Sequence, residues 1–137
     1  MIKYPTKEEI LEKEVLFKKD TIASTIEWKK RFFEKGKWKD ANKNEAIKLL
    51  LSSYADIYAM PVHVDIKNID PMYDPTTLTI YLNKEKPSIL SAMHEFAHHL
   101  YGSSELTACR WSVWLFKKTF PKTYESLVWD NHMLRKP

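Results

Sequence analysis

The spacing of apolar residues in the first sixty positions is that of amphipathic helices. Apolar side chains recur there every three or four residues, which places them on one side of a helix. We therefore expect three helices, at residues 6–19, 21–35 and 42–59. Thr6 can cap the first through its hydroxyl, Gly36 follows the second, and Pro61 prevents the third from continuing. The second helix is predicted to bury the stripe Ile22, Ile26 and Phe33.

The period then shortens to two residues. Apolar and polar residues alternate at residues 62–66 and again at 77–82, which is the pattern of half-buried strands. Residues 69–76, which contain Pro71 and Pro75, are predicted to form a loop between them. The sequence therefore predicts a small sheet.

Helical spacing returns after this sheet. We expect helices at residues 87–101 and 104–119, and a shorter one after Pro121. Pro87 suits the first helical position, where an amide hydrogen would have no partner, and Gly102 suits the position just past a helix. Helices, then a small sheet, then helices is the order of an α+β fold.

The chain has 137 residues, of which 44% are hydrophobic, enough for one domain with its own core. We expect a single domain over 1–137, with a helical part (1–60), the small sheet (61–83), a pair of helices (87–120) and a C-terminal segment (121–137). No signal peptide and no apolar run of membrane-spanning length is recognisable, which favours a cytoplasmic protein without a membrane partner.

The net charge of +4 is modest, and the densest basic patch lies at residues 27–39. Basic residues are interleaved there with Trp28, Phe32, Phe33 and Trp38. A basic surface with exposed aromatic side chains can bind nucleic acid. An amphipathic helix that buries its aromatic residues gives the same pattern, and we favour this interpretation, so nucleic acid is not an expected partner.

The segment "HEFAH", residues 94–98, is the most specific chemical signal in the chain. Residues four apart on a helix lie one above the other, so His94 and His98 can share one metal ion. Glu95, beside them, can take a proton from a water molecule without occupying a coordination position. A metal ion lowers the pKa of such a water molecule and polarises a carbonyl, which is the chemistry of amide hydrolysis.

The same short motif also occurs by chance, on helices whose histidines are solvated or lie at the edge of a core. Here the two histidines lie beside the apolar stripe rather than on it; the stripe is Ile89, Met93, Phe96, Ala97 and Leu100. This placement favours a metal site at the rim of a cleft. His99 points to another side of the helix, and we expect it to be structural or to support a ligand from behind.

A catalytic zinc ion takes three protein ligands and keeps one position open. The single cysteine excludes a multi-cysteine zinc site. The candidates for the third ligand are Glu105, Cys109, Glu125, Asp130 and His132. We favour Glu105, because it opens the next helix directly after the turn at Gly102 and can reach back to the histidines. It would also complement the helix dipole there, and the two roles are compatible.

The stretch "HEFAHHLYGSSELTACRW", residues 94–111, resembles the active-site region of the gluzincin metallopeptidases. Its short form is most similar to the minigluzincins, small stand-alone peptidase domains of prokaryotes. It is also similar to peptidase domains that cleave phage-type repressors, whose glutamate helix reads E-x-x-A, matched here by Glu105 and Ala108. The resemblance covers residues 76–120.

The resemblance implies a zincin-like fold and one zinc ion per chain, with Glu95 as general base and three ligands: His94, His98 and Glu105. It also implies that the strand at residues 77–82 is a sheet edge on which an extended peptide substrate docks. Two features depart from the family pattern. The gap between His98 and Glu105 is shorter than in thermolysin-like members, and Cys109 stands where those members have an acidic residue.

Two further roles stay open at this point. An oxyanion could be stabilised by Tyr101, Tyr124 or His132. The C-terminal segment could lie in the cleft and keep the enzyme latent, as the minigluzincin resemblance suggests, or it could be a frayed or simply packed terminus.

The sequence thus favours a zinc-dependent peptidase. The alternatives are a catalytically silent zinc domain that binds a protein or nucleic-acid partner, and a purely structural zinc domain. Glu95 distinguishes them, because a structural site has no use for a general base beside its ligands.

Overall fold

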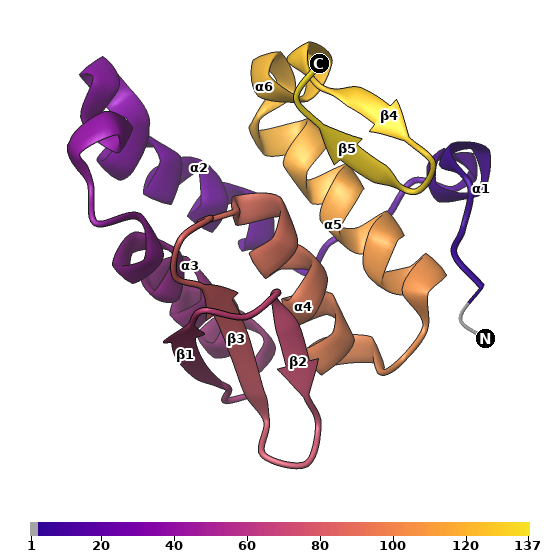
Figure 1. Ribbon diagram of the computed structural model, residues 1–137, viewed down its shortest axis with the longest axis horizontal. Coiled ribbons are helices and arrows are strands. Elements are labelled where there is room, and N and C mark those ends of the chain that lie inside the picture. The colour runs from indigo at the N-terminus through magenta and orange to yellow at the C-terminus, as the bar shows by residue number, and fades with distance from the viewer. Residues whose placement is uncertain (1–2) are drawn as a thin grey trace.

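The computed structural model describes residues 3–137 and has an α+β fold (Figure 1), which confirms the predicted class. The helices are α1 (Lys7–Glu12), α2 (Thr21–Phe33), the 3₁₀ helix η1 (Glu34–Asp40), α3 (Lys43–Tyr58), α4 (Ile89–Tyr101), α5 (Glu105–Thr119) and α6 (Pro121–Ser126). The strands are β1 (His63–Lys67), β2 (Met72–Asp74), β3 (Thr79–Asn83), β4 (Val128–Asp130) and β5 (Met133–Arg135).

The first three strands form a sheet in the order β1-β3-β2. Strand β3 pairs in parallel with β1 and antiparallel with β2, so it is the central strand. The prediction that residues 77–82 form a sheet edge is therefore wrong, and the edges within the described residues are β1 and β2. Strand β2 lies in the predicted loop, where only three residues between Pro71 and Pro75 are too few to show an alternating pattern.

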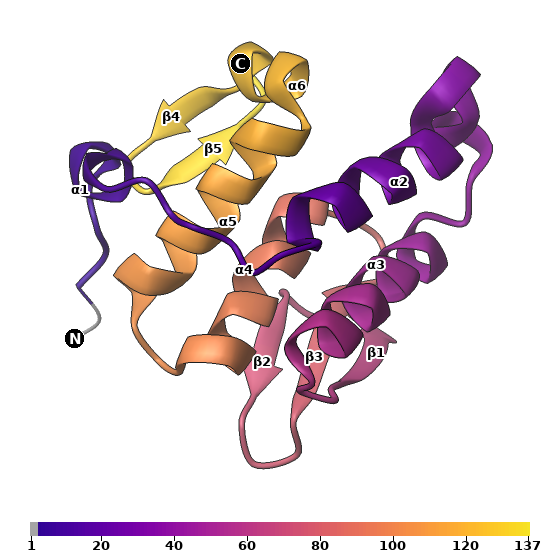
Figure 2. The same ribbon diagram turned by 180° about the vertical axis from the view of Figure 1, so that it is seen from behind.

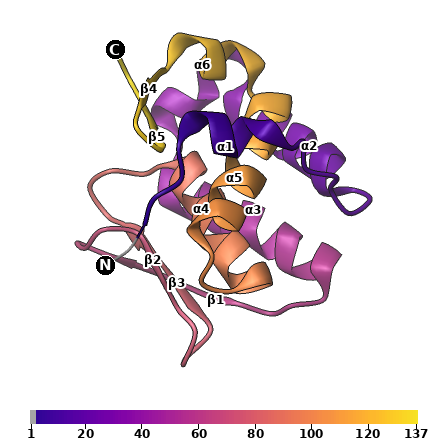
Figure 3. The same ribbon diagram turned by 90° about the vertical axis from the view of Figure 1, so that its right-hand side faces the viewer.

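Helices α3 and α4 pack against one face of this sheet, as the side view shows (Figure 3). The strand residues that join this core are Val64, Ile66, Tyr73, Ile80 and Leu82. On the opposite face of β1, the alternate residues His63, Asp65 and Lys67 are exposed. The predicted alternation is confirmed, and it places the polar face of the sheet away from the helices.

Helix α1 begins as predicted but is shorter. The Thr6 hydroxyl accepts from the Glu9 amide at 3.2 Å, and the Glu9 carboxylate accepts from the Thr6 amide at 3.1 Å. The helix ends at Glu12 rather than at residue 19. Val15 and Phe17 then pack against the core from non-helical backbone, two residues apart, which is the spacing of an extended chain.

The buried face of helix α2 matches the predicted one only in part. Ile22 and Phe33 are half-buried against the core as predicted, whereas Ile26 is 38% exposed. The buried residues of the helix are Thr21, Thr25 and Trp28. The threonines face α3, which lies beside α2 (Figure 2), and their hydroxyls contact the Tyr58 and Tyr54 hydroxyls at 2.9 and 2.6 Å. Hydrogen bonding to these tyrosines therefore decides the buried face, a preference that the apolar pattern cannot show.

The ends of α4 and α5 are set by serine caps and one glycine. Ser88 caps α4, so Pro87 lies one residue outside the helix and not at its first position as predicted. Gly102 follows α4 with φ of +91°, as expected for glycine just past a helix end. Ser104 accepts from the Thr107 amide at 3.2 Å and starts α5 after a three-residue turn.

The C-terminal strands β4 and β5 form an antiparallel hairpin that lies over α5 (Figure 1). Trp129 and Leu134 pack from this hairpin against a small cluster made of Ile10, Cys109 and Val113. The segment is therefore folded and packed rather than frayed. In the part of the chain described here, no helix combines the length and apolarity needed to cross a bilayer.

Candidate metal centre

His94 and His98 lie one turn apart on the side of α4 that faces α5. Both are half-buried, and their ring centroids are 4.8 Å apart with the ring planes at 81°. They flank the buried residues Met93, Phe96 and Ala97, as the apolar pattern predicts. The histidines thus stand at the edge of the core with their rings turned toward the next helix.

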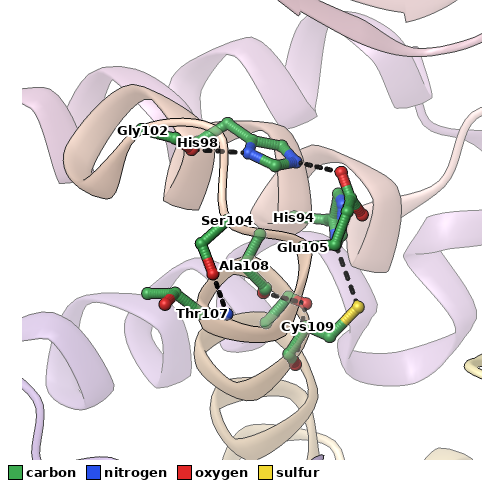
Figure 4. Close-up of polar contacts among 9 residues, drawn as sticks. His94, His98, Gly102, Ser104, Glu105, Thr107, Ala108 and Cys109 are labelled. Atoms are coloured by element: carbon green, nitrogen blue, oxygen red, sulfur yellow. Dashed lines mark hydrogen bonds and ion pairs between the residues drawn. The ribbon is translucent and has the colours of Figure 1, made fainter. Parts of the chain in front are cut away.

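Glu105, the first residue of α5, reaches both histidines. Its Oε2 lies 3.2 Å from His94 Nε2 and its Oε1 lies 2.9 Å from His98 Nε2, so the carboxylate sits between the two imidazoles (Figure 4). The short turn that follows Gly102 brings the carboxylate back over the end of α4. The structure therefore gathers the three predicted ligands in one cluster.

The hydrogen bond made by Nδ1 of His98 determines which nitrogen of the ring carries the hydrogen. His98 Nδ1 lies 2.7 Å from the Gly102 carbonyl oxygen, which can only accept, so Nδ1 carries a hydrogen. A neutral imidazole in this form presents a lone pair at Nε2, and that atom faces the Glu105 carboxylate. Two acceptors at this distance need a positive charge between them or on the ring, which a metal ion or an extra proton supplies.

The donor atoms fit a zinc ion in kind. Two ligands bound at 2.0–2.1 Å to a tetrahedral zinc ion are about 3.3 Å apart, and Glu105 lies 3.2 Å from His94 through one oxygen and 2.9 Å from His98 through the other. Two imidazole nitrogens and one carboxylate are also the donor set that leaves a fourth position open. Burial lowers the pKa of His94, against the raising effect of the Glu105 carboxylate, which favours the neutral imidazole that binds metal.

Cys109 offers a second possible donor set. Ligand-capable atoms of His94, Glu105 and Cys109 all lie within 4.8 Å of one another. The Cys109 sulfur, however, contacts His94 at Nδ1, 3.9 Å away, whereas the Glu105 carboxylate faces Nε2 (Figure 4). A group behind the far nitrogen of a ligand histidine orients its ring. Burial, with the nearby Glu105 and Glu95 carboxylates, raises the pKa of the thiol to about 12, so it is neutral without a metal.

Glu95 is half-buried beside the same cluster. Burial raises its pKa to about 7, with His98 acting to lower it and Glu105 to raise it. The main-chain amide of Tyr73, on strand β2, also interacts with this carboxylate and lowers its pKa. A carboxylate with a pKa near neutrality can both accept and return a proton at physiological pH, as a general base must.

His99 has the structural role expected for it. It is 7% exposed, and its ring contacts the Tyr73 hydroxyl through Nδ1 at 2.8 Å and the Met60 carbonyl oxygen through Nε2 at 3.0 Å. Both partners lie on the sheet side of α4, away from Glu105. His99 therefore ties α4 to β2 and to the end of α3.

Of the three candidates for oxyanion stabilisation, His132 is the one whose charge acts on the cluster. Its charge acts to lower the pKa of His94, as a smaller effect than burial. Tyr101 is 51% exposed and lies against Tyr58 and Trp111, and Tyr124 packs near Lys117. The sequence could not single out His132, because its position depends on a hairpin with no clear strand pattern.

The other candidate ligands are engaged elsewhere. Glu125 is exposed on α6, and Asp130 forms an ion pair with Arg135 at 3.1 Å across the hairpin. The ion pairs of His94 and His98 within the described residues are those with Glu105.

The aromatic side chains of the basic patch pack against one another and the core rather than forming a solvent-exposed surface. Trp28 is 6% exposed and donates to the Ala46 carbonyl at 2.7 Å, and Phe33 stacks on Trp38 with ring centroids 4.4 Å apart. This favours the amphipathic-helix interpretation over a stacking surface for nucleic acid. Two surface grooves lie nearby, along the outer side of α3, and neither is lined by the histidine cluster.

Comparison of the chain with protein-family models, with curated protein sequences and with solved structures found no match. The function is therefore inferred from the geometry of the cluster and from the sequence motif.

Proposed function

We propose that this chain is a zinc-dependent metallopeptidase of gluzincin type with a zincin-like fold. The observation that carries the proposal is the position of Glu105, whose carboxylate lies between the two histidines of the H-E-x-x-H motif. This class of site needs a third metal ligand that lies outside the H-E-x-x-H motif in the sequence but next to its histidines in space. The resemblance to the minigluzincins supports the same interpretation.

In this proposal His94, His98 and Glu105 bind one zinc ion per chain. When bound, the ion would polarise the scissile carbonyl and lower the pKa of a water molecule. Glu95 takes the proton from the attacking water and delivers it to the departing amine nitrogen, a task that its pKa of about 7 suits. Cys109 and the Gly102 carbonyl hold the two imidazoles in orientation through their Nδ1 atoms.

Strand β2 is the edge on which we expect a peptide substrate to pair. It is the sheet edge that contacts α4, the helix that carries Glu95. The other edge, β1, is separated from β2 by β3 and contacts α3. An extended peptide adding to β2 would lie beside the proposed general base.

The substitution Glu95→Gln tests the proposed reaction. We expect the variant to bind one zinc ion per chain and to lose peptide hydrolysis by at least about 100-fold, because a general base contributes 10²–10⁴-fold. Zinc content is measured by elemental analysis, and turnover with a pool of quenched-fluorescent peptides. Glu125→Gln, on the exposed face of α6, is the matched control. Equal turnover in Glu95→Gln and the control would contradict the assigned role.

One observation favours a catalytically silent alternative. Ligand-capable atoms of Cys109, His94 and Glu105 lie within 4.8 Å of one another, so the thiol is near enough to add a protein donor to the site. A zinc ion with four protein ligands has no open position and serves structure, as in a regulatory domain that binds a protein or nucleic-acid partner. Zinc bound by the unaltered chain, with a sulfur ligand and without cleavage of any peptide, would favour this alternative.

We also propose that the C-terminal hairpin limits access to the site. The charge of His132 acts to lower the pKa of His94, and the His132 ring stacks on Tyr4 with centroids 4.1 Å apart and planes at 7°. The hairpin is held on α5 by Trp129 and Leu134. Turnover should therefore rise when residues 130–137 are removed, or in the milder double variant Tyr4→Ala/His132→Ala. Unchanged turnover in both would contradict latency.

A further inference from the structure

Tyr73 and His99 join strand β2 to helix α4, which carries the half-buried Glu95 one turn before His99. We propose that these two are positioning residues, which fix the free edge of β2 against Glu95. The catalytic consequence rests on the proposed peptidase function, whereas the positioning itself is a property of the fold.

His99 can hold Tyr73 in only one way. The Met60 carbonyl oxygen accepts, so His99 Nε2 carries the hydrogen and Nδ1 presents a lone pair. The Tyr73 hydroxyl therefore donates to Nδ1, at 2.8 Å. The ring of His99 is buried, and it packs edge-on against Phe96 with centroids 5.6 Å apart. The acceptor that receives the phenol is thus immobilised by α4 on one side and by Met60 on the other.

Strand β2 has few other attachments. It spans three residues, and only β3 pairs with it within the described chain. Tyr73 is its middle residue, opposite Ile80. Its side chain reaches His99 on helix α4, one turn after Glu95. One side-chain contact therefore links the strand to the helix that carries the carboxylate.

The consequence concerns how an extended peptide would meet the base. Strand β2 sets the position of a peptide that pairs with it, and Glu95 takes a proton from the attacking water molecule. The distance between the strand and the carboxylate therefore decides whether the peptide bond and the water molecule meet. A misplacement of about 1 Å is enough to cost about 100-fold in rate. Loss of the phenol oxygen leaves the three metal-binding side chains untouched and relaxes this distance.

The test uses Tyr73→Phe, with Tyr54→Phe as the matched control. The control removes a phenol that makes a 2.6 Å contact with Thr25 between α2 and α3, remote from β2. Three quantities are measured on full-length protein. They are the hydrogen-exchange rate of the residue 73 amide, relative to its intrinsic rate, and kcat and KM for the peptide cleaved best by the unaltered chain. Zinc content is determined for each variant.

In Tyr73→Phe we expect the residue 73 amide to exchange at least about fivefold faster and kcat to fall about tenfold, with KM within about twofold and zinc retained. In Tyr54→Phe we expect the free energy of unfolding to fall. The exchange rate of the residue 73 amide, kcat and KM should stay unchanged once they are corrected for the fraction of folded protein. Unchanged exchange at residue 73, or a kcat no lower than that of the control, overturns the proposal. If the unaltered chain cleaves no peptide, the peptidase function fails, and exchange at residue 73 alone then decides whether the pair positions the strand.

Discussion

Helix α4 carries adjacent histidines whose surroundings differ on its two sides. His99, on the sheet side, has one acceptor and one donor as partners, the Met60 carbonyl and the Tyr73 hydroxyl, and both of its nitrogens are satisfied without any charge. His98, on the α5 side, donates to the Gly102 carbonyl and turns its other nitrogen toward a carboxylate that it shares with His94.

The difference lies in what the partner can offer. A histidine between a neutral donor and a neutral acceptor has both ring nitrogens hydrogen-bonded and stabilises the fold. A histidine whose lone pair faces a carboxylate needs a cation between the two groups, either a proton or a metal ion. The residue type and the helix are the same on both sides, so partner chemistry alone separates a structural histidine from a candidate ligand.

The largest expected effect separates these two histidines by metal binding. His98→Ala should weaken zinc binding by at least about 100-fold, because even groups that only orient a ligand are worth 10- to 100-fold. His99→Ala should bind zinc in the same one-to-one ratio. Competition titration with a chromophoric chelator measures both affinities. Equal loss of zinc in the two variants would remove the distinction between the two faces of α4.

The next prediction asks whether Glu105 or Cys109 is the third metal ligand. Cys109→Ala should weaken zinc binding by about tenfold or less, as expected for a group that orients His94 through Nδ1. Glu105→Gln, which keeps the shape of the side chain and removes its charge, should weaken it at least as much as His98→Ala. A loss in Cys109→Ala equal to that in Glu105→Gln would assign the cysteine to the metal and leave the site closed.

A smaller effect concerns stability on the sheet side. His99→Ala should lower the free energy of unfolding by about 3 kcal/mol, because it deletes a buried ring and leaves the Met60 carbonyl and the Tyr73 hydroxyl without their partner. His98→Ala, at the half-buried rim, should lower it by about 1 kcal/mol in metal-free protein. Urea unfolding in the presence of a chelator gives both values. The reverse order would contradict the structural role of His99.

The smallest effect is a pH dependence of the metal-free protein. The pKa of Glu95 is raised from 4.5 to about 7 by burial, so between these values the folded chain keeps a proton that the unfolded chain has lost. Stability should therefore fall as pH rises from about 5 to about 7, by about 1–2 kcal/mol. The lowered pKa of His94 makes stability rise with pH, and this contribution is still present in the Glu95→Gln variant. Unfolding curves with chelator at several pH values should show a flatter or reversed slope in that variant.

The cluster could be predicted from the sequence because its geometry is local. His94 and His98 are fixed by helical spacing, and Glu105 is brought back by a turn of three residues after Gly102, whose positive φ ends α4. The same locality made the caps at Thr6 and the end of α3 predictable. Each of these features depends on residues within about a dozen positions of one another.

The features that the sequence did not show depend on distant partners. Strand β2 has three residues and exists because β3 pairs with it, and its presence moves β3 from the edge to the centre of the sheet. The threonines that α2 buries contact tyrosines of α3, and the hairpin that carries His132 packs against Ile10 and Val113. No periodicity along the chain encodes such contacts.

X-ray absorption on the zinc-loaded protein tests the central claim, that the face of α4 toward α5 binds a metal ion through His94, His98 and Glu105. We expect one zinc ion per chain with only nitrogen and oxygen ligands at about 2.0–2.1 Å. A sulfur ligand at about 2.3 Å, or the absence of stoichiometric zinc, would contradict it.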